Sequence, residues 1–323
     1  MSIFAVVPPL VSDPTLIFFV VLLIILFAPI VMSKLRIPHI IGMVLAGVLV
    51  GPYGLNILAR GSSFEIFGQV GIYYIMFLAG LEMDMESLKR DSRNFLTFGL
   101  LTCLVPLLMT YVVAKTVLGY SNETSFLLGC IMASNTLVAY PIVGRYGLQR
   151  HPSVGLSVGS SMISLFLALV MLAALASGIG GASLPFTADL SPSVRQLLFW
   201  ALFLLKLAAF MVASVLFIPR LTRFFLRRYS DAVMQYIYVL SVMFLSAALT
   251  SLIGLEGIFG AFFSGLILNR YIPQVSPLMN RIEFIGNAVF IPYFLIGVGM
   301  LINVRTLMHG GEVLFFYFLS VIY

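Results

Sequence analysis

The chain has 323 residues, of which 61% are hydrophobic and 9% are charged, and its mean hydropathy is +1.11. A typical soluble domain is about 25% charged, so this chain has too little polar surface to cover a globule in water. The composition excludes an ordinary soluble protein and indicates an integral membrane protein that is surrounded largely by lipid.

Eleven apolar runs reach or approach the roughly 20 residues that a membrane-spanning helix needs. They cover residues 15–33, 38–57, 64–83, 95–117, 123–144, 153–177, 196–219, 232–252, 255–269, 282–302 and 311–323. We therefore expect an all-α, polytopic membrane helix bundle of about 11 helices. These helices are expected to form a single transmembrane transport domain over residues 1–323.

The net charge of +6 is explained by the placement of basic residues in alternate connecting segments. One side of the predicted bundle carries four of them, Arg60, Lys115, Arg195 and Arg305. The other carries thirteen, Lys34, Arg36, Lys89, Arg90, Arg93, Arg145, Arg150, Arg220, Arg223, Arg227, Arg228, Arg270 and Arg281. The positive-inside rule places the richer side in the cytoplasm. It predicts an N-terminus outside and the Tyr323 end inside, in a bacterial inner membrane, and it leaves no basic face for nucleic acid.

An internal repeat links the two halves of the chain. Gly42 and Gly47 match Gly260 and Gly265 with the same spacing inside each pair, and a downstream block at Gly80 matches Gly299 at nearly the same offset along the chain. The predicted helix over 38–57 begins inside the cell, whereas that over 255–269 begins outside. Inverted repeats of this kind are typical of secondary transporters, although Gly-x4-Gly spacings also arise where small residues pack helices together.

The fifth run has a polar centre, at Ser134, Asn135 and Thr136, followed by Pro141. Proline removes a backbone donor, and a break in a membrane helix is tolerated where it lines protein or water. We interpret this segment as a broken crossing helix that contacts a cation. A proline-kinked helix with hydroxyls bonded to its neighbours is the structural alternative. The matching break would fall near residue 353, so the second repeat is expected to be truncated.

A serine stripe marks one face of the sixth run. Its members recur with helical spacing, at Ser157, Ser160, Ser161 and Ser164. The stripe faces protein rather than lipid, either as a hydrophilic path or as a packing seam of small residues.

Four further polar residues are candidates for the ion path. Lys206 stands alone in an apolar run, where it either faces the bundle interior or extends its stem toward the interface. Glu256 opens a short helix, Glu283 and Asn287 lie one turn apart in the tenth run, and each has a purely structural alternative. The three histidines lie at helix ends and the two cysteines lie in apolar runs, so we expect neither a metal site nor a cofactor.

Four segments resemble the sodium/hydrogen exchanger family, and in particular its cation:proton antiporter-2 branch, which includes glutathione-gated potassium efflux antiporters. They are residues 37–52, the Phe77–Met83 segment, residues 257–265 and residues 290–300. The resemblance implies an exchanger fold with a dimerisation domain and a core domain, alternating access, a homodimer in the bilayer, and transport of Na⁺ or K⁺ against H⁺. It also implies that Asn135 and Thr136 lie where broken helices cross.

The sequence departs from the family pattern in two places. Leu165 stands where family members usually carry a membrane aspartate, and no Lys or Arg occurs between Ile282 and Val304. Serine and asparagine can coordinate a cation but do not titrate near neutral pH, so Glu283 or Glu256 would have to carry the proton. A cation:proton antiporter is the first functional hypothesis. A transport-inactive or sensory membrane protein, and a sodium-coupled symporter, are the alternatives to it, and no motif of an enzyme is found.

Overall fold

The computed structural model describes residues 10–11, 13–35, 38–59, 61–83, 92–134, 143, 146–148, 151–180 and 192–304. In these ranges every regular element is a helix, apart from one isolated bridge between Val11 and Leu58. The helices are α1 (Pro14–Lys34), α2 (His39–Val50), α3 (Ser62–Glu82), α5 (Ser92–Thr116), α6 (Asn122–Ala133), α8 (Pro152–Gly180), α9 (Pro192–Arg228), α10 (Ala232–Ile253), α11 (Gly257–Leu268), α12 (Pro277–Ile285), the π-helix η1 (Gly286–Phe290) and α13 (Ile291–Leu301).

The all-α membrane architecture is confirmed. Seven helices of the described part are long and apolar enough to cross a bilayer, and α2 and α11 are shorter apolar helices. The predicted runs from 15–33 to 282–302 each coincide with a helix, with α12, η1 and α13 following one another without interruption. The predicted run 311–323 lies outside the described residues.

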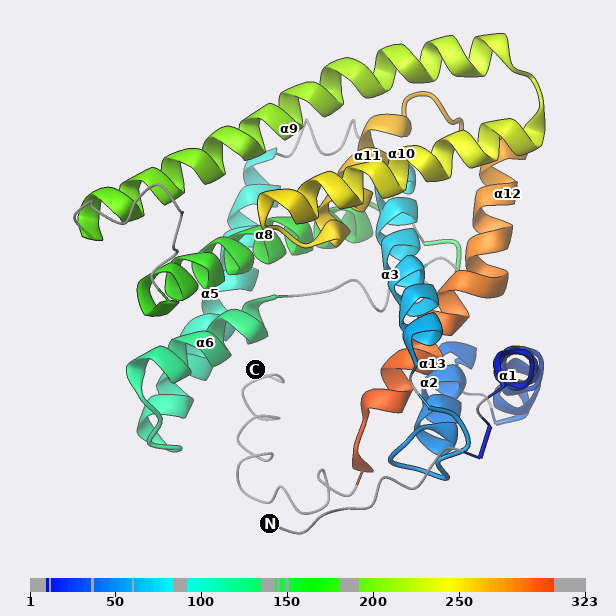
Figure 1. Cartoon of the computed structure of the whole chain (residues 1–323), viewed down its shortest axis with the longest axis horizontal. Helices are drawn as coiled ribbons and strands as arrows, with labels where there is room; N and C mark the ends of the chain where they lie inside the picture. Colours follow the sequence, from blue (N-terminus) through cyan, green and yellow to red (C-terminus); the bar gives the residue numbers. More distant parts are fainter. Residues whose placement is uncertain are drawn as a thin grey trace. The chain divides into compact units, whose positions relative to one another are not determined.

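The chain divides into two compact units. The first unit comprises Met1–Ile75 and Asn280–Gly311, and the second unit comprises Met76–Met279 and Glu312–Tyr323. In the first unit α2 packs against both α1 and α13 (Figure 1).

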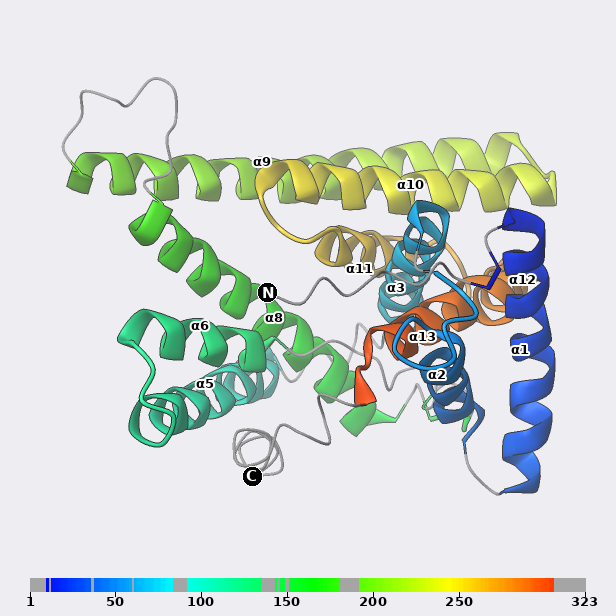
Figure 2. The ribbon, with the colours of Figure 1, turned by 60° about the horizontal axis from the view of Figure 1, so that its bottom comes forward.

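The second unit contains two groups of packed helices. In one group, α5, α6 and α8 contact one another. In the other, α10 contacts both α9 and α11, and Figure 2 shows α10 running beside the long α9. Close approach in the first group depends on glycine, because a Cβ added at Gly129 of α6 would lie 2.9 Å from the Leu107 carbonyl oxygen of α5.

Several predicted boundaries were wrong, and three of the differences have identifiable reasons. The second helix ends at Val50 rather than at 57, because Pro52 disfavours the helical conformation at Gly51, which is extended with φ −72° and ψ 175°. Conversely, α9 continues to Arg228, past the predicted end at 219, through a segment rich in arginine, leucine and phenylalanine, and arginine and leucine favour helix. The tenth helix begins at Pro277 rather than at 282 and widens into η1 shortly before Pro292, which has no N–H to donate.

The predicted repeat appears as one set of contacts found in both units. In the first unit, a Cβ added at Gly47 of α2 would lie 2.2 Å from the Ile296 carbonyl oxygen of α13. In the second unit, a Cβ added at Gly265 of α11 would lie 2.3 Å from the Phe77 carbonyl oxygen of α3. Gly265 is the repeat counterpart of Gly47, and Ile296 is that of Phe77, at almost the same offset along the chain. Each early helix therefore pairs with a late one, which is the exchange of partners that a two-fold relation between the repeats produces.

The same offset relates the contacts of the other two helices of the repeat. Gly42 of α2 lies against Ala28 and Met32 of α1, and its match Gly260 of α11 lies against α10. The residues of α10 that Gly260 meets are Ser246 and Thr250, which follow Ala28 and Met32 by the offset that separates the two glycines. The repeat thus includes α1 and α10, whose sequences show no visible match.

Candidate functional site

Helix α6 ends inside the predicted apolar run, at Ala133. Ser134 follows as the C-cap residue with φ −78° and ψ 90°, which takes the backbone out of the helix. Its N–H donates to the carbonyl oxygens of Cys130 and Ile131 at 3.2 and 3.3 Å. The final carbonyls of a helix carry a partial negative charge, so this end of α6 presents oxygen atoms suited to a cation.

Ser164 of α8 connects the serine stripe to the end of α6. Its hydroxyl donates to the Ala133 carbonyl oxygen at 2.7 Å, and both residues are fully buried. They lie next to an apolar cluster that includes Cys103, Leu107 and Cys130. The hydrogen bond fixes α8 against the last carbonyls of α6, so the serine stripe and the end of α6, which were predicted separately, are in contact.

The other three serines of the stripe differ in how deeply they are buried. The Ser160 hydroxyl is buried and donates to the Leu156 carbonyl oxygen at 2.6 Å, and it lies 3.5 Å from the Phe95 carbonyl oxygen of α5. Ser161 is half-buried and Ser157 is exposed. The stripe is therefore in part the packing seam that the sequence also allowed.

Several predicted residues of the broken helix are not tested. Asn135, Thr136 and Pro141 lie outside the described residues, so Ser134 alone represents this segment in the structure. Leu165, which directly follows Ser164, is described and fully buried.

Glu283 and Asn287 belong to the first unit and are separated by the start of η1. Glu283 is half-buried near the end of α12, whereas Asn287 is exposed in the π-helix. They are thus not two positions on a regular α-helical face, because a π-turn adds a residue to the helical repeat. π-turns of this kind are frequent at functional sites.

The remaining two candidates lie at exposed positions of the second unit. Lys206 is exposed on α9 between apolar neighbours, which favours a side chain that leaves the packed face rather than one in the bundle interior. Glu256 lies in the connection between α10 and α11 as the N-cap residue of α11, but its side chain makes no capping hydrogen bond. Although the Glu256 side chain is exposed, neighbouring protein atoms partly desolvate its carboxyl, which raises its pKa above the usual value.

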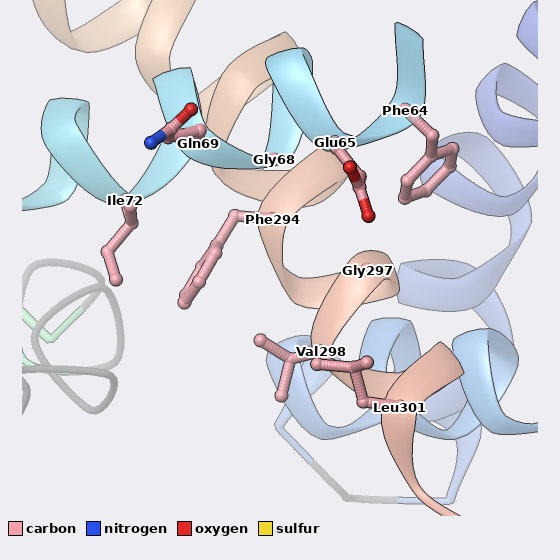
Figure 3. Close-up of a pocket in the computed structure, with 9 residues that line it drawn as sticks. All are labelled: Phe64, Glu65, Gly68, Gln69, Ile72, Phe294, Gly297, Val298 and Leu301. Atoms are coloured by element: carbon pink, nitrogen blue, oxygen red, sulfur yellow. The ribbon is translucent and has the colours of Figure 1, made fainter. Parts of the chain in front are cut away.

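Sequence reasoning missed a cavity in the first unit, of about 400 Å³, between α3 and α13. Figure 3 shows the Glu65 side chain extending from α3 toward α13, with Gln69 one helical turn further along. The Gln69 amide donates to the Tyr73 hydroxyl at 3.0 Å, so three oxygen-bearing side chains follow one another along one face of α3. The regular spacing of these polar residues in an apolar run could have indicated a polar face from the sequence. The sequence does not show that α13 leaves space beside this face.

Close packing borders the cavity. A Cβ added at Gly297 of α13 would lie 3.1 Å from the Phe64 ring, and both residues line the cavity. Among the described residues, no group of three or more His, Cys, Asp or Glu side chains is placed to hold a metal ion. The side chains that line the cavity include one carboxylate, Glu65, and one amide, Gln69.

Comparison with known proteins agrees with this architecture. The chain resembles the solved sodium proton antiporter MjNhaP1 of Methanocaldococcus jannaschii with a TM-score of 0.62 and 19% identity, over 93% of this chain and 74% of that one. At this identity the likeness shows the fold.

Two sequence relatives are closer in identity. The Na⁺/H⁺ antiporter NhaS5 of Synechocystis is 34% identical over 91% of this chain, but this chain spans 40% of its length. The probable Na⁺/H⁺ antiporter 3 of Methanocaldococcus jannaschii is 30% identical over 90% of this chain and 72% of its own length. The family model described as "Sodium/hydrogen exchanger, transmembrane" matches residues 22–323. The chain belongs to the transmembrane sodium/hydrogen exchanger family.

Proposed function

We propose that the protein is a secondary active transporter that exchanges a monovalent cation for a proton by alternating access. The observation that carries this proposal is the end of α6 at Ala133, within apolar sequence, where Ser164 of α8 binds the Ala133 carbonyl oxygen. A helix that stops there leaves its last carbonyl oxygens outside the regular α-helical pattern, and such ends are tolerated at membrane depth where they are buried in protein or line a water-filled cavity. The names of the relatives, Na⁺/H⁺ antiporters, support the same activity.

The cation is expected to bind at the C-terminal end of α6. The negative end of the helix dipole favours a cation there, and Ser134, Asn135 and Thr136 would add side-chain oxygens. Ser164 acts as a positioning residue in this scheme, because it holds the Ala133 carbonyl and hence the last turn of α6.

The proton requires a different group, since Leu165 stands where we align the family carboxylate. Glu256 and Glu283 are the first candidates, and Glu65 in the cavity of the first unit is a third. Desolvation of a carboxyl raises its pKa, and the pKa of Glu256 is raised in this way.

The buried Leu165 also favours the alternatives in which a protein on the same fold does not couple cation movement to protons. These are a transport-inactive or sensory membrane protein and a sodium-coupled symporter. We further propose membership of the cation:proton antiporter-2 branch, a homodimer, an inner-membrane location, and an N-terminus on the outside.

The function is tested by reconstituting the purified protein in vesicles that contain a pH-sensitive dye. Adding Na⁺, K⁺ or Li⁺ to acid-loaded vesicles should dequench the dye for at least one cation. Asn135→Ala should abolish the response and Ser157→Ala, at an exposed stripe position, should leave it. A wild type that moves labelled Na⁺ without moving protons would instead support the symporter. No movement of either ion would refute the proposal in favour of a sensory protein.

A further inference from the structure

Helix α9 is much longer than a bilayer is thick. Its 37 residues span roughly 55 Å at the α-helical rise, whereas the hydrocarbon core measures about 30 Å. The apolar part and the final arginine-rich turns therefore cannot both lie in hydrocarbon, and the C-terminal end of α9 reaches the level of the lipid headgroups.

The last three turns of α9 have two different faces. On one face Thr222 is fully buried, and its hydroxyl lies 2.8 Å from the Tyr238 hydroxyl of α10. Phe225 stacks on the Tyr238 ring with 4.6 Å between the ring centroids. These contacts attach this face to α10, beside which α9 runs in both views (Figure 1, Figure 2).

The opposite face gathers positive charge around a concave surface, which we name the arginine site. It is an open depression of about 540 Å³ that is lined by Arg220, Arg223, Phe224, Arg227 and Arg228. All four arginines are exposed. Arg220 and Arg223 donate hydrogen bonds to carbonyl oxygens one turn earlier in α9, at 2.7 and 3.3 Å, so these two side chains lie back along their own helix.

The sequence around the arginine site has few acidic residues that could balance the charge of the four arginines. From residue 192 to 255 the sequence has one acidic residue, Asp231. Its carboxylate accepts the Met234 N–H at 3.0 Å and caps α10. The arginine site therefore carries an excess of positive charge, and guanidinium groups are suited to binding phosphate oxygens.

Apolar side chains on the same stretch of α9 favour a lipid over a soluble anion. Phe217, Leu221 and Phe224 are 71%, 52% and 65% exposed. They follow the helix from the apolar part toward the arginines, so a molecule with acyl chains and a phosphate would contact both.

We propose that the arginine site binds the headgroup of an anionic phospholipid in the leaflet to which the positive-inside rule assigns these arginines, the cytoplasmic one. Basic clusters that directly follow a membrane helix attract anionic headgroups, and each basic residue contributes about a five-fold gain in binding. The site lies on α9 and does not depend on the proposed antiport activity.

The test titrates the purified protein in neutral detergent with phosphatidylglycerol or phosphatidylcholine and counts bound lipids by native mass spectrometry. Phosphatidylglycerol should bind more tightly than phosphatidylcholine. The double variant Arg223→Gln/Arg227→Gln should bind phosphatidylglycerol about 25-fold more weakly. The control Arg270→Gln/Arg281→Gln, which removes the same charge from other segments, should stay within about two-fold of the wild type.

Two further measurements separate loss of charge from loss of folding, and a lipid from a soluble anion. Arg223→Lys/Arg227→Lys keeps the charge and should retain most of the binding, which separates lost charge from lost folding. Inorganic phosphate at about 10 mM should not displace the lipid. Equal binding of both lipids, equal weakening by the control pair, or full displacement by phosphate would each overturn the proposal, and the last would assign the site to a soluble anion.

Discussion

Gly265→Ala places a methyl group where α3 and α11 of the second unit touch. The added Cβ would lie 2.3 Å from the Phe77 carbonyl oxygen and 3.2 Å from the Leu81 nitrogen. Both atoms belong to the backbone of α3, so a change of side-chain rotamer cannot relieve the clash and the helices must separate. Overpacking of this kind costs about 3 kcal/mol, and the better helix propensity of alanine returns about 1 kcal/mol. We expect a net loss of about 2 kcal/mol in the free energy of unfolding.

Thermal unfolding in mild detergent measures the effect. A loss of that size should lower Tm by about 4 °C. Gly68→Ala is the matched control, because a Cβ at this position of α3 meets no atom within 4 Å. The control should keep or slightly raise Tm, since it gains the helix propensity without the clash.

The repeat adds a second requirement. Gly47→Ala makes the corresponding contact in the first unit, 2.2 Å from the Ile296 carbonyl oxygen, and should lower Tm by a similar amount. A Gly265→Ala protein as stable as Gly68→Ala would refute the packing argument. If only one of the Gly265→Ala and Gly47→Ala variants had a lower Tm, the equivalence of the two repeats would be refuted.

Ser164→Ala removes the hydrogen bond to α6, which is worth about 1 kcal/mol in a membrane. It should weaken the apparent cation affinity about five-fold, whereas Ser157→Ala should leave the affinity unchanged. A Ser164→Ala variant with the cation affinity of the wild type would contradict the positioning role of Ser164. Leu165→Asp should introduce or strengthen proton coupling in the vesicle assay, and an unchanged proton flux would argue against our alignment of α8. Glu256→Gln should gain stability over the wild type as pH rises above about 4.5, because the raised pKa of Glu256 favours its protonated form in the folded protein; Tm values that run parallel from about pH 4 to 8 would contradict this. Arg228→Cys should react with an impermeant maleimide from the cytoplasmic side alone, and labelling from outside would reverse the predicted topology.

The sequence predicted helix positions well where apolar length decides them, and less well where polar or proline residues change the ending. The runs at 15–33 and 232–252 agree with α1 and α10 to within a residue or two. The end of α9 was missed because arginine was read as a mark of the membrane boundary, although arginine is a good helix former and the helix continues beyond the bilayer.

The candidate site was predicted in pieces. Ser134 and Ser164 were each identified from local pattern, but the contact between their helices was not, because it depends on how α6 and α8 pack against each other. Lys206 was left open between interior and surface, since one isolated cation in an apolar run has no periodic partner to indicate its face.

The sequence by itself determined that the protein lies in a membrane, where its helices lie and that it contains a repeat. Lipid imposes a length and an apolar composition on each membrane-spanning helix, and the matching glycines of the repeat recur at a fixed offset. Tertiary structure decided where the polar side chains lie. Ser164 contacts the last carbonyl of α6, and Glu65 lines a cavity beside α13. The arginines of α9 lie on the face opposite to Thr222. These outcomes depend on how helices far apart in the chain pack together, and no local pattern of residues encodes that packing.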